Sequence, residues 1–248
     1  TGDFNGTEFT PDQQEIKWVD RGPDNYAGIT WHNTGSRKLF LGWMSNWDYA
    51  QIVPTSAWRS AMTIPRELAL AHTEKGYTLT SLPIKELETL RGPAQSKEKI
   101  TIQQGYDLSG NLSSFDNKFM LQLKSATLSN FSIQLSNDNG ENLVIGYDTA
   151  GNQYFIDRTH AGNYSFSPKF PNKAVAPRIA AAKELDLTLV VDNASVELFA
   201  DHGLTSMTSI FFPKKPYTRL TLSAPETLTL DSLTYWPMHR IWPASPGL

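Results

Sequence analysis

The sequence predicts an all-β protein, and three observations support this fold class. Apolar and polar residues alternate with a period of two in many short runs of the 248-residue chain. Turn-forming residues separate these runs, since the chain holds 16 Gly and 15 Pro. Only Leu82–Gly92 has the spacing of a helix, with Leu87 and Leu90 one turn apart and Gly92-Pro93 ending it.

Residues 1–38 are predicted to form short strands separated by turns. Gly and Pro interrupt this segment at short intervals, which leaves no room for a helix of several turns. Within it, Ile16–Val19 and Ala27–His32 have the length and composition of strands in a sheet.

The next strand is predicted at Lys38–Met44, where the pattern alternates and Trp43 shares a face with two leucines. Met62–Leu70 continues as strand and is interrupted at Pro65, because proline is tolerated in a sheet only at an edge or a bulge. The pattern then loosens, and we interpret residues 72–96 as a connector.

The period-two pattern is most persistent after the connector and predicts a two-sheet sandwich over residues 97–238. Turn-forming residues at 137–140 and 192–194 are typical of hairpins that join successive strands. The alternating runs are 119–124, 131–136, 187–191, 196–200 and 220–222.

Composition excludes several classes of function. The net charge of −3 and the lack of a basic block argue against a nucleic-acid partner. No apolar run reaches the roughly 20 residues of a membrane span. The chain has no Cys, and its five His residues show no metal-ligand spacing, so no metal or other cofactor is expected. The N-terminus lacks a signal-peptide pattern, so we expect a chain that is mature or truncated.

Leu39–Leu70 is the stretch with the clearest chemical character. Four aromatic residues fall there among short polar residues and one arginine: Trp43, Trp47, Tyr49 and Trp58 among Ser45, Asn46, Asp48, Thr55 and Arg59. This mixture suits a sugar, whose C–H faces are covered by aromatic rings and whose hydroxyls bind polar groups. The alternative, that these are half-buried aromatic residues of an ordinary sheet, stays open at this point.

Five segments resemble glycoside hydrolase family 32, which holds invertases, exo-inulinases and levanases. Three resemble the end of its catalytic propeller, in the family's order: GDFNGTEF (Gly2–Phe9), DRGPDNYAGITW (Asp20–Trp31) and GWMSNWDYAQIVPTSAWRSAMTIPREL (Gly42–Leu68). Two resemble its C-terminal module: QYFIDRTHAG (Gln153–Gly162) and ASVELFADHGLTSMTSIFFP (Ala194–Pro213). The resemblance spans nearly the whole chain.

The resemblance implies a five-bladed β-propeller that carries the active site, followed by a β-sandwich. Because one blade takes roughly 40 to 50 residues, the segment of about 70 residues before the connector holds only the closing part of a propeller. We therefore expect three units: residues 1–71 as the C-terminal part of the catalytic propeller, 72–96 as connector, and 97–248 as C-terminal β-sandwich module.

The resemblance also implies retaining hydrolysis of β-fructosidic bonds in levan, inulin or sucrose. The family's aspartate nucleophile, glutamate acid/base and stabilising aspartate lie in motifs of the type WMNDPNG, RDP and EC, and none of these occurs here. We therefore assign no catalytic residue and expect a C-terminal fragment that is inactive alone, whose partners are the N-terminal propeller segment and a fructan or sucrose. A secreted or periplasmic bacterial protein is expected.

Four residues are predicted to bind substrate. Trp47 is the first choice to line a fructose subsite, with Trp43 as the fallback because its alternation with leucines favours the core. Asp24 and Tyr26 fall in the PDNYAG segment, where Asp24 is expected to accept a sugar hydroxyl or to position a neighbouring loop. Asp48 is expected only to hold a turn. Retaining hydrolysis needs two carboxylates roughly 5 Å apart, and we do not assign Asp24 and Asp48 to that role.

Other polar groups are predicted to be structural. Arg59 and Arg66-Glu67 are expected in ion pairs at strand ends rather than on substrate. Asp157-Arg158 is expected to act where the sandwich packs against the propeller. Asp201-His202-Gly203 is expected to be a turn between two strands.

A second hypothesis is that the sandwich is a carbohydrate-binding or purely structural module without catalysis. Two or more aromatic residues on one exposed face of the sandwich would favour it. The candidates fall mostly within alternating or apolar runs, which indicates burial; they are Phe119, Phe131, Tyr154, Phe155, Phe199, Phe211, Phe212 and Tyr217. A free-standing regulatory protein is the third hypothesis, disfavoured because an incomplete propeller exposes strand edges.

Overall fold

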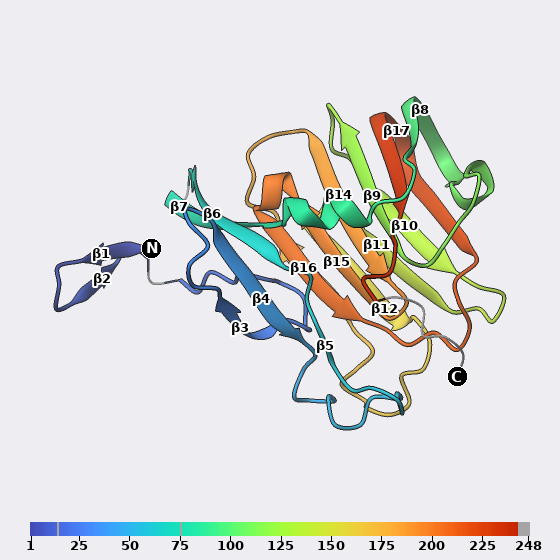
Figure 1. The fold of residues 1–248 in the computed structure, drawn as a ribbon. Helices are drawn as coiled ribbons and strands as arrows, with labels where there is room; N and C mark the ends of the chain where they lie inside the picture. Colours follow the sequence, from blue (N-terminus) through green and yellow to red (C-terminus); the bar gives the residue numbers. More distant parts are fainter. Residues whose placement is uncertain (14, 75, 243–248) are drawn as a thin grey trace.

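The computed structural model describes residues 1–13, 15–74 and 76–242, and strands make up most of its regular structure. Figure 1 shows a small group of strands near the N-terminus and a larger body of strands that follows it in the chain. The end of the predicted sandwich module, residues 243–248, lies outside the described residues.

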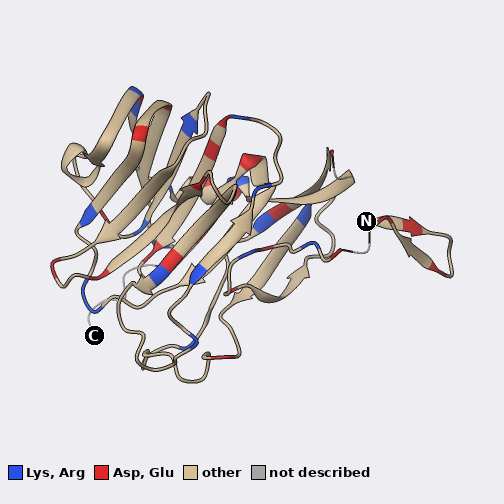
Figure 2. Ribbon diagram, turned by 180° about the vertical axis from the view of Figure 1, so that it is seen from behind, with Lys and Arg blue, Asp and Glu red and all other residues tan. Residues whose placement is uncertain are grey.

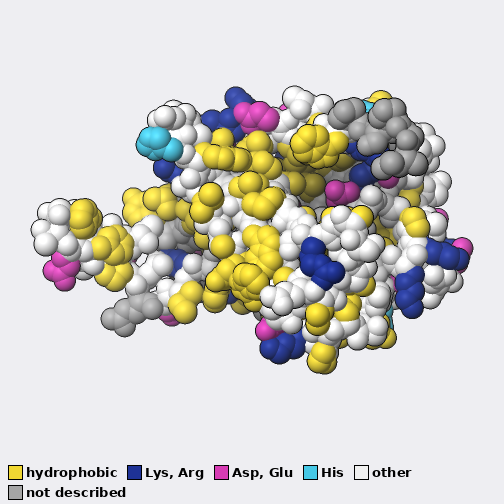
Figure 3. All heavy atoms as spheres, turned by 60° about the horizontal axis from the view of Figure 1, so that its bottom comes forward, with side chains coloured by type: hydrophobic (Ala, Val, Ile, Leu, Met, Phe, Trp, Pro, Cys, Tyr) yellow, Lys and Arg dark blue, Asp and Glu magenta, His cyan; other side chains and the backbone are white. Residues whose placement is uncertain are grey.

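The first two strands form a hairpin that projects from the molecule (Figure 1). β1 (Gly2–Phe4) pairs with β2 (Phe9–Pro11) in an antiparallel sheet of their own. Phe4 and Phe9 face each other across this pair and are 66% and 54% exposed. Figure 3 shows hydrophobic side chains on the surface of this hairpin. It therefore buries little apolar surface of its own.

Five strands form the next sheet, in the order β3-β4-β6-β7 with β5 paired to β4. The predicted strand over Lys38–Met44 is confirmed, and Pro65 separates β5 from β6 as expected. The predicted strand over Ile16–Val19 is wrong, because this segment has no ladder partner among the described residues. The bounds are β3 (Tyr26–Thr30), β4 (Lys38–Met44), β5 (Ala61–Met62), β6 (Arg66–Thr73) and β7 (Gly76–Pro83).

β4 buries the face opposite to the one predicted. Phe40, Gly42 and Met44 are buried, whereas the face that carries Trp43 is half-buried. The interpretation of Trp43 as a core residue is therefore wrong. Alternation alone does not say which face meets the core, and here Met44 packs into a cluster with residues of the larger body.

The segment predicted as a connector contains a complete strand. β7 pairs with β6 along its whole length, from Arg66 opposite Pro83 to Thr73 opposite Gly76. The predicted helix at Leu82–Gly92 is a short 3-10 helix, η1 (Lys85–Leu90). η1 leads into the first strand of the larger body.

The larger body is the predicted β-sandwich. One layer contains β13, β12, β11 and β10, and the other contains β9, β14, β15 and β16. The bounds are β8 (Gln95–Asp107), η2 (Ser109–Asn111), β9 (Phe119–Ser125), β10 (Phe131–Ser136), β11 (Asn142–Asp148), β12 (Gln153–His160), β13 (Lys173–Pro177), β14 (Leu185–Asp192), β15 (Ser195–Ala200), η3 (Asp201–Gly203), β16 (Thr205–Ile210) and β17 (Arg219–Pro237).

β17 joins the two layers. Its residues 219–223 pair with β10, and its residues 232–237 pair with β9. The register against β8 shifts between Ala224 and Leu228. A strand that bends at a bulge can pass from one sheet of a sandwich to the other.

One apolar cluster fills the space between the layers. Ile133 and Ile145 come from one layer and Leu121 and Leu189 from the other, and all four are 0% exposed. The alternating runs of the sequence are strands, as predicted, and the turns at 137–140 and 192–194 join β10 to β11 and β14 to β15. The sandwich therefore has a core of its own.

The N-terminal strands meet the sandwich along β16. The backbone N–H of Arg21 donates to the Ser206 carbonyl (2.8 Å), and that of Asp24 donates to the Thr208 carbonyl (3.3 Å). Gly22 lies between them, where a Cβ would fall 2.0 Å from the Thr208 carbonyl oxygen. No larger residue fits this close approach of two backbones.

Candidate functional site

Three of the four predicted substrate-binding residues lie together on the surface. Tyr26 of β3 is paired with Trp43 of β4, and their ring centroids are 6.1 Å apart. The ring centroids of Trp43 and Trp47 are 4.9 Å apart. Trp47 is 62% exposed and Tyr26 54%. We call Tyr26, Trp43 and Trp47 the aromatic cluster; adjacent exposed rings of this kind can cover the C–H face of a sugar.

A tight turn places Trp47 at the surface. The Asn46 carbonyl accepts hydrogen bonds from the backbone N–H groups of Tyr49 (3.1 Å) and Ala50 (2.8 Å). The Asn46 side chain accepts from the N–H of Asp48 (2.9 Å) and donates to the Pro23 carbonyl (2.9 Å). Because Tyr49 and Ala50 are buried, the turn leaves its tip in solvent.

Asp24 lies apart from the aromatic cluster, at the junction with the sandwich. It is 0% exposed and accepts hydrogen bonds from Arg158 Nη1 (2.6 Å), the Ile210 N–H (2.9 Å) and the Tyr49 hydroxyl. Burial raises the pKa of the Asp24 carboxyl, and attraction to Arg158 opposes this rise. Of the two roles considered for Asp24, this geometry favours positioning a neighbouring loop, since Tyr49 belongs to the turn that carries Trp47.

A second buried ionic group lies nearby. Arg66 is 0% exposed and binds Asp20 Oδ2 (2.7 Å), Glu197 Oε2 (2.5 Å) and the Thr208 hydroxyl (2.6 Å). Glu197 also accepts from the backbone N–H of Ile64 (2.8 Å). Burial raises the pKa of the Glu197 carboxyl, and the Arg66 charge opposes that rise. β6 is thereby fastened to β15 and β16.

The remaining predicted structural groups have mixed outcomes. Arg158 lies at the junction as expected, but its partner is Asp24, whereas Asp157 accepts hydrogen bonds from the backbone N–H and the hydroxyl of Thr159 within its own strand. Asp201 lies in η3, the turn between β15 and β16, and pairs with Arg178. Arg59 donates to two carbonyls of its own loop rather than to a carboxylate.

Figure 2 shows acidic and basic residues interspersed on both parts of the molecule. Within the described residues, no group of three or more His, Asp or Glu is placed to hold a metal ion. No helix in that same part of the chain is both long and apolar enough to cross a membrane.

Seven of the eight sandwich aromatic residues considered above are buried. Phe155 is half-buried, and the other seven residues considered above are each at most 9% exposed. No two of these eight therefore share an exposed face, which is the condition that would favour a binding module built on sandwich aromatics.

The residues that support the aromatic cluster do not follow from the sequence patterns. Tyr49 and Asn46 are predicted only as part of the mixture suited to a sugar, whereas Tyr49 is buried and Asn46 closes the turn. Arg158 is not linked to Asp24 by the sequence. A signal existed for Asn46, because an Asn two residues before Asp48 is typical of a turn closed by its side chain. No local signal links Arg158 to Asp24, since they lie 134 residues apart.

Two family models match the chain. The model described as "Glycosyl hydrolases family 32 N-terminal domain" matches residues 1–83, and "Glycosyl hydrolases family 32 C terminal" matches residues 86–237. A levanase of Bacillus subtilis (strain 168) is 36% identical over 259 residues, which cover 99% of this chain and 38% of that protein. An extracellular exo-inulinase of Aspergillus awamori is 32% identical over 244 residues, covering 93% of this chain and 45% of that protein.

The fold is similar to that of a solved relative. A crystal structure of exo-inulinase from Aspergillus awamori matches with a TM-score of 0.82 at 29% identity, covering 97% of this chain and 49% of that chain. This chain therefore spans about half, or less, of the length of these relatives. The predicted fold class is confirmed: an all-β chain with the closing part of a five-bladed β-propeller followed by a β-sandwich.

Proposed function

The chain belongs to glycoside hydrolase family 32, and from this premise we propose that it is the C-terminal part of a retaining β-fructofuranosidase acting on levan, inulin or sucrose. Relatives named levanase and exo-inulinase support this substrate class. The observation that carries the proposal is the aromatic cluster, which exposes adjacent rings on the part that matches the family's N-terminal domain.

In this proposal Trp47 lines the fructose subsite, with Trp43 and Tyr26 beside it. The three rings present apolar surface that covers one face of a furanose ring and excludes water from it. Asp24 contributes indirectly, because it binds the buried Tyr49 hydroxyl and so holds the turn that carries Trp47.

The catalytic acids are proposed to lie on the preceding propeller segment, which is the main partner of this chain. The two acids nearest the cluster are engaged otherwise: Asp24 with Arg158 (2.6 Å) and Asp48 with Lys169 (2.7 Å). The chain alone is therefore proposed to be inactive, since retaining hydrolysis needs two free carboxylates about 5 Å apart. A secreted or periplasmic location is part of the proposal, and the word "extracellular" in a relative's name supports it.

The test compares fructose release from levan, inulin and sucrose by this chain and by the chain extended at its N-terminus with the rest of its reading frame. Only the extended form is expected to be active. Turnover by the short chain would contradict the assignment of the acids and would return attention to Asp24 and Asp48.

The extended form also tests the subsite. Trp47→Ala is expected to lower kcat/KM about tenfold or more, the effect of losing roughly 1.4 kcal/mol of binding. Trp242→Ala is the matched control, because Trp242 is also exposed, at 77%, and lies near the C-terminus. Equal activity of the two variants would remove Trp47 from the subsite.

A further inference from the structure

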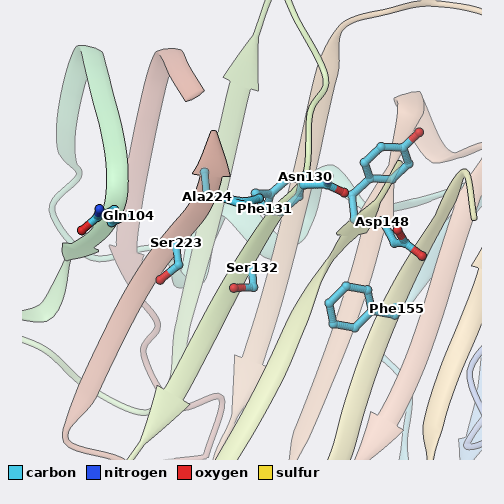
Figure 4. A pocket seen from close by; sticks show the side chains of 10 residues that line it. Gln104, Asn130, Phe131, Ser132, Asp148, Phe155, Ser223 and Ala224 are labelled. Carbon is cyan, nitrogen blue, oxygen red and sulfur yellow. The ribbon is translucent and has the colours of Figure 1, made fainter. Parts of the chain in front are cut away.

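A hollow of about 490 Å³ opens on the outer face of the sandwich. Only sandwich residues line it, from β8, β10, β11, β12, β17 and the adjoining loops, and Figure 4 shows these side chains over the strands. Its volume falls in the range of small-molecule sites, about 300–1,000 Å³. The hollow is separate in sequence and in elements from the aromatic cluster.

The strand register explains why the surface sinks here. Phe155 is paired with Gly146, Gly146 with Ser132, Ser132 with Ser223, and Ser223 with Gly105. Because directly paired residues of neighbouring strands point to the same face, these five residues form one row across five strands. Four of the five are Gly or Ser, whose side chains rise little above the sheet and so form the floor of the hollow. The larger side chain of Phe155 lies at one end of the row.

The glycine beside Phe155 is required by the position of the ring. A Cβ at Gly146 would lie 2.8 Å from the Phe155 Cζ atom and 2.2 Å from the Phe131 carbonyl oxygen. The Phe155 ring therefore leans over the floor of the hollow. It stays half-buried, and Lys173 Nζ lies 4.1 Å from its centroid.

Unused polar groups lie further along the same row and at its rim. The hydroxyls of Ser132 and Ser223 have no hydrogen-bond partner within the described residues, and Figure 4 shows them directed to the same side. Asn130 uses its side-chain oxygen to accept from Thr149, which leaves its NH2 group without a partner in that part of the chain. Hydroxyl and amide groups beside an aromatic ring form the kind of surface that a sugar complements.

The backbone at the rim is also unusual. Gln104 has a φ of 67° although it is not glycine, and it is paired with Ala224, where the register between β8 and β17 begins to shift. Bulges of this kind redirect side chains and are enriched beside binding sites. The exposed Gln104 side chain borders the hollow.

We propose that this hollow is a second sugar site that binds one fructosyl unit of an oligofructoside. Phe155 covers the apolar face of the ring, and Ser132 and Ser223 bind its hydroxyls. A neutral ligand suits the hollow, because one charge of each sign borders it: Asp148 in the lining and Lys173 over the Phe155 ring. The choice of fructose among sugars rests on the proposed function. Contact with one small ring predicts a dissociation constant on the order of 1 mM.

An NMR titration of this chain with the trisaccharide 1-kestose tests the site. We expect saturable shifts of backbone amides around Ser132, Gly146 and Ser223 in the wild type, and the same shifts in Trp47→Ala. Ser132→Leu fills the hollow and is expected to abolish them. Ser136→Leu is the matched control, because Ser136 lies on the same strand and face, outside the hollow.

Three outcomes would overturn the inference. The first is an absence of shifts around the hollow in the wild type, a result that needs no variant to fold. The second is a set of shifts confined to the aromatic cluster and lost in Trp47→Ala. The third, equal shifts with the glucose trisaccharide maltotriose, would remove the assignment of fructose. Fructan hydrolysis by the extended form tests the proposed function separately. The sugar site in the hollow and the proposed function can therefore each be disproved without the other.

Discussion

Residues 1–83 and the sandwich contain the same kinds of strand-forming residues and bury them differently. Aromatic residues of the sandwich such as Phe119 and Tyr154 are 0% exposed, whereas Trp18 and Trp47 in the first part are 64% and 62% exposed. The sandwich closes two layers over one core. Residues 1–83, which we call the propeller part, form one sheet and a separate hairpin. Most apolar side chains of the propeller part therefore have no second layer to pack against.

The propeller part obtains its interior from the sandwich. Of its few buried apolar residues, Met44, Tyr49 and Val53 belong to a cluster completed by sandwich residues such as Phe170 and Ile210. The two buried arginines likewise each bind one acid across the junction: Arg66 binds Glu197, and Arg158 binds Asp24. From this difference we expect the folded structure of the propeller part to depend on its contacts with the sandwich, whereas the sandwich is expected to fold around its own core.

Breaking the junction is expected to have the largest effect. Arg66→Met leaves Asp20 and Glu197 buried without a cation, which costs about 3–5 kcal/mol of the free energy of unfolding. Urea unfolding measures the loss, and hydrogen exchange should show β6 and β7 losing protection while β14 keeps it. Arg219→Met is the control, since it removes an exposed ion pair. Equal loss of protection in β14 would contradict the dependence of one part on the other.

A cavity in the sandwich core is expected to destabilise the sandwich and the propeller part together. Leu198 is 0% exposed in β15, and Leu198→Ala should cost about 2–5 kcal/mol through lost burial and a cavity. Because the propeller part relies on the sandwich, amides of β4 and β14 should lose protection in the same proportion. Leu70→Ala, at a leucine that is 58% exposed, is the control. Protection of β4 that outlasts that of β14 would show that the propeller part is ordered by itself.

Two neighbouring residues of one turn sharpen the comparison further. Tyr49→Phe removes a hydroxyl that donates to Asp24 and accepts from Arg158, so it should cost about 1–3 kcal/mol. Trp47→Phe at the exposed tip should change the free energy of unfolding by less than about 0.5 kcal/mol. Thermal or urea unfolding of the two variants checks this. Similar losses in both would mean that Trp47 is part of the packing rather than a free surface.

Local sequence patterns predicted most of the fold, because apolar and polar residues alternate along a strand that has one buried face. The runs that became β4, β9, β10, β14 and β15 were all identified in this way. β7 was missed because its short alternation falls in a loose, polar stretch. The bend that lets β17 serve both layers was missed because a bulge depends on the partner strand, which the sequence of β17 does not record.

The candidate residues were named from the sequence, whereas the residues that support them were not. The resemblance pointed to Trp47, Trp43 and Tyr26, and the structure brings these three together. The exposure of these three side chains did not follow from the pattern. Alternation shows that a strand has two faces, but it does not show which face is buried. The pairing of Asp24 with Arg158 joins positions far apart in the chain, and no spacing rule reaches that distance.

The smallest expected effect comes from an ion pair at the exposed edge of the same junction. Hydrogen bonds from Arg37 to Glu86 (2.5 and 3.0 Å) lower the pKa of Glu86 from 4.5 to about 2. Because the folded pKa is depressed, the pair stabilises the fold above the unfolded pKa, and this contribution is lost as pH falls from about 4.5 to about 2.

Arg37→Gln should return the Glu86 pKa toward 4.5 in an NMR titration, with no resolved change of the urea midpoint at pH 7, because solvent screens exposed charges. Arg59→Gln, which removes a guanidinium that binds two carbonyls of its own loop, should leave the Glu86 pKa unchanged. Because Arg37 also binds Glu67 of β6 (2.8 Å), a clear loss of stability in Arg37→Gln would contradict the small effect expected of exposed ion pairs.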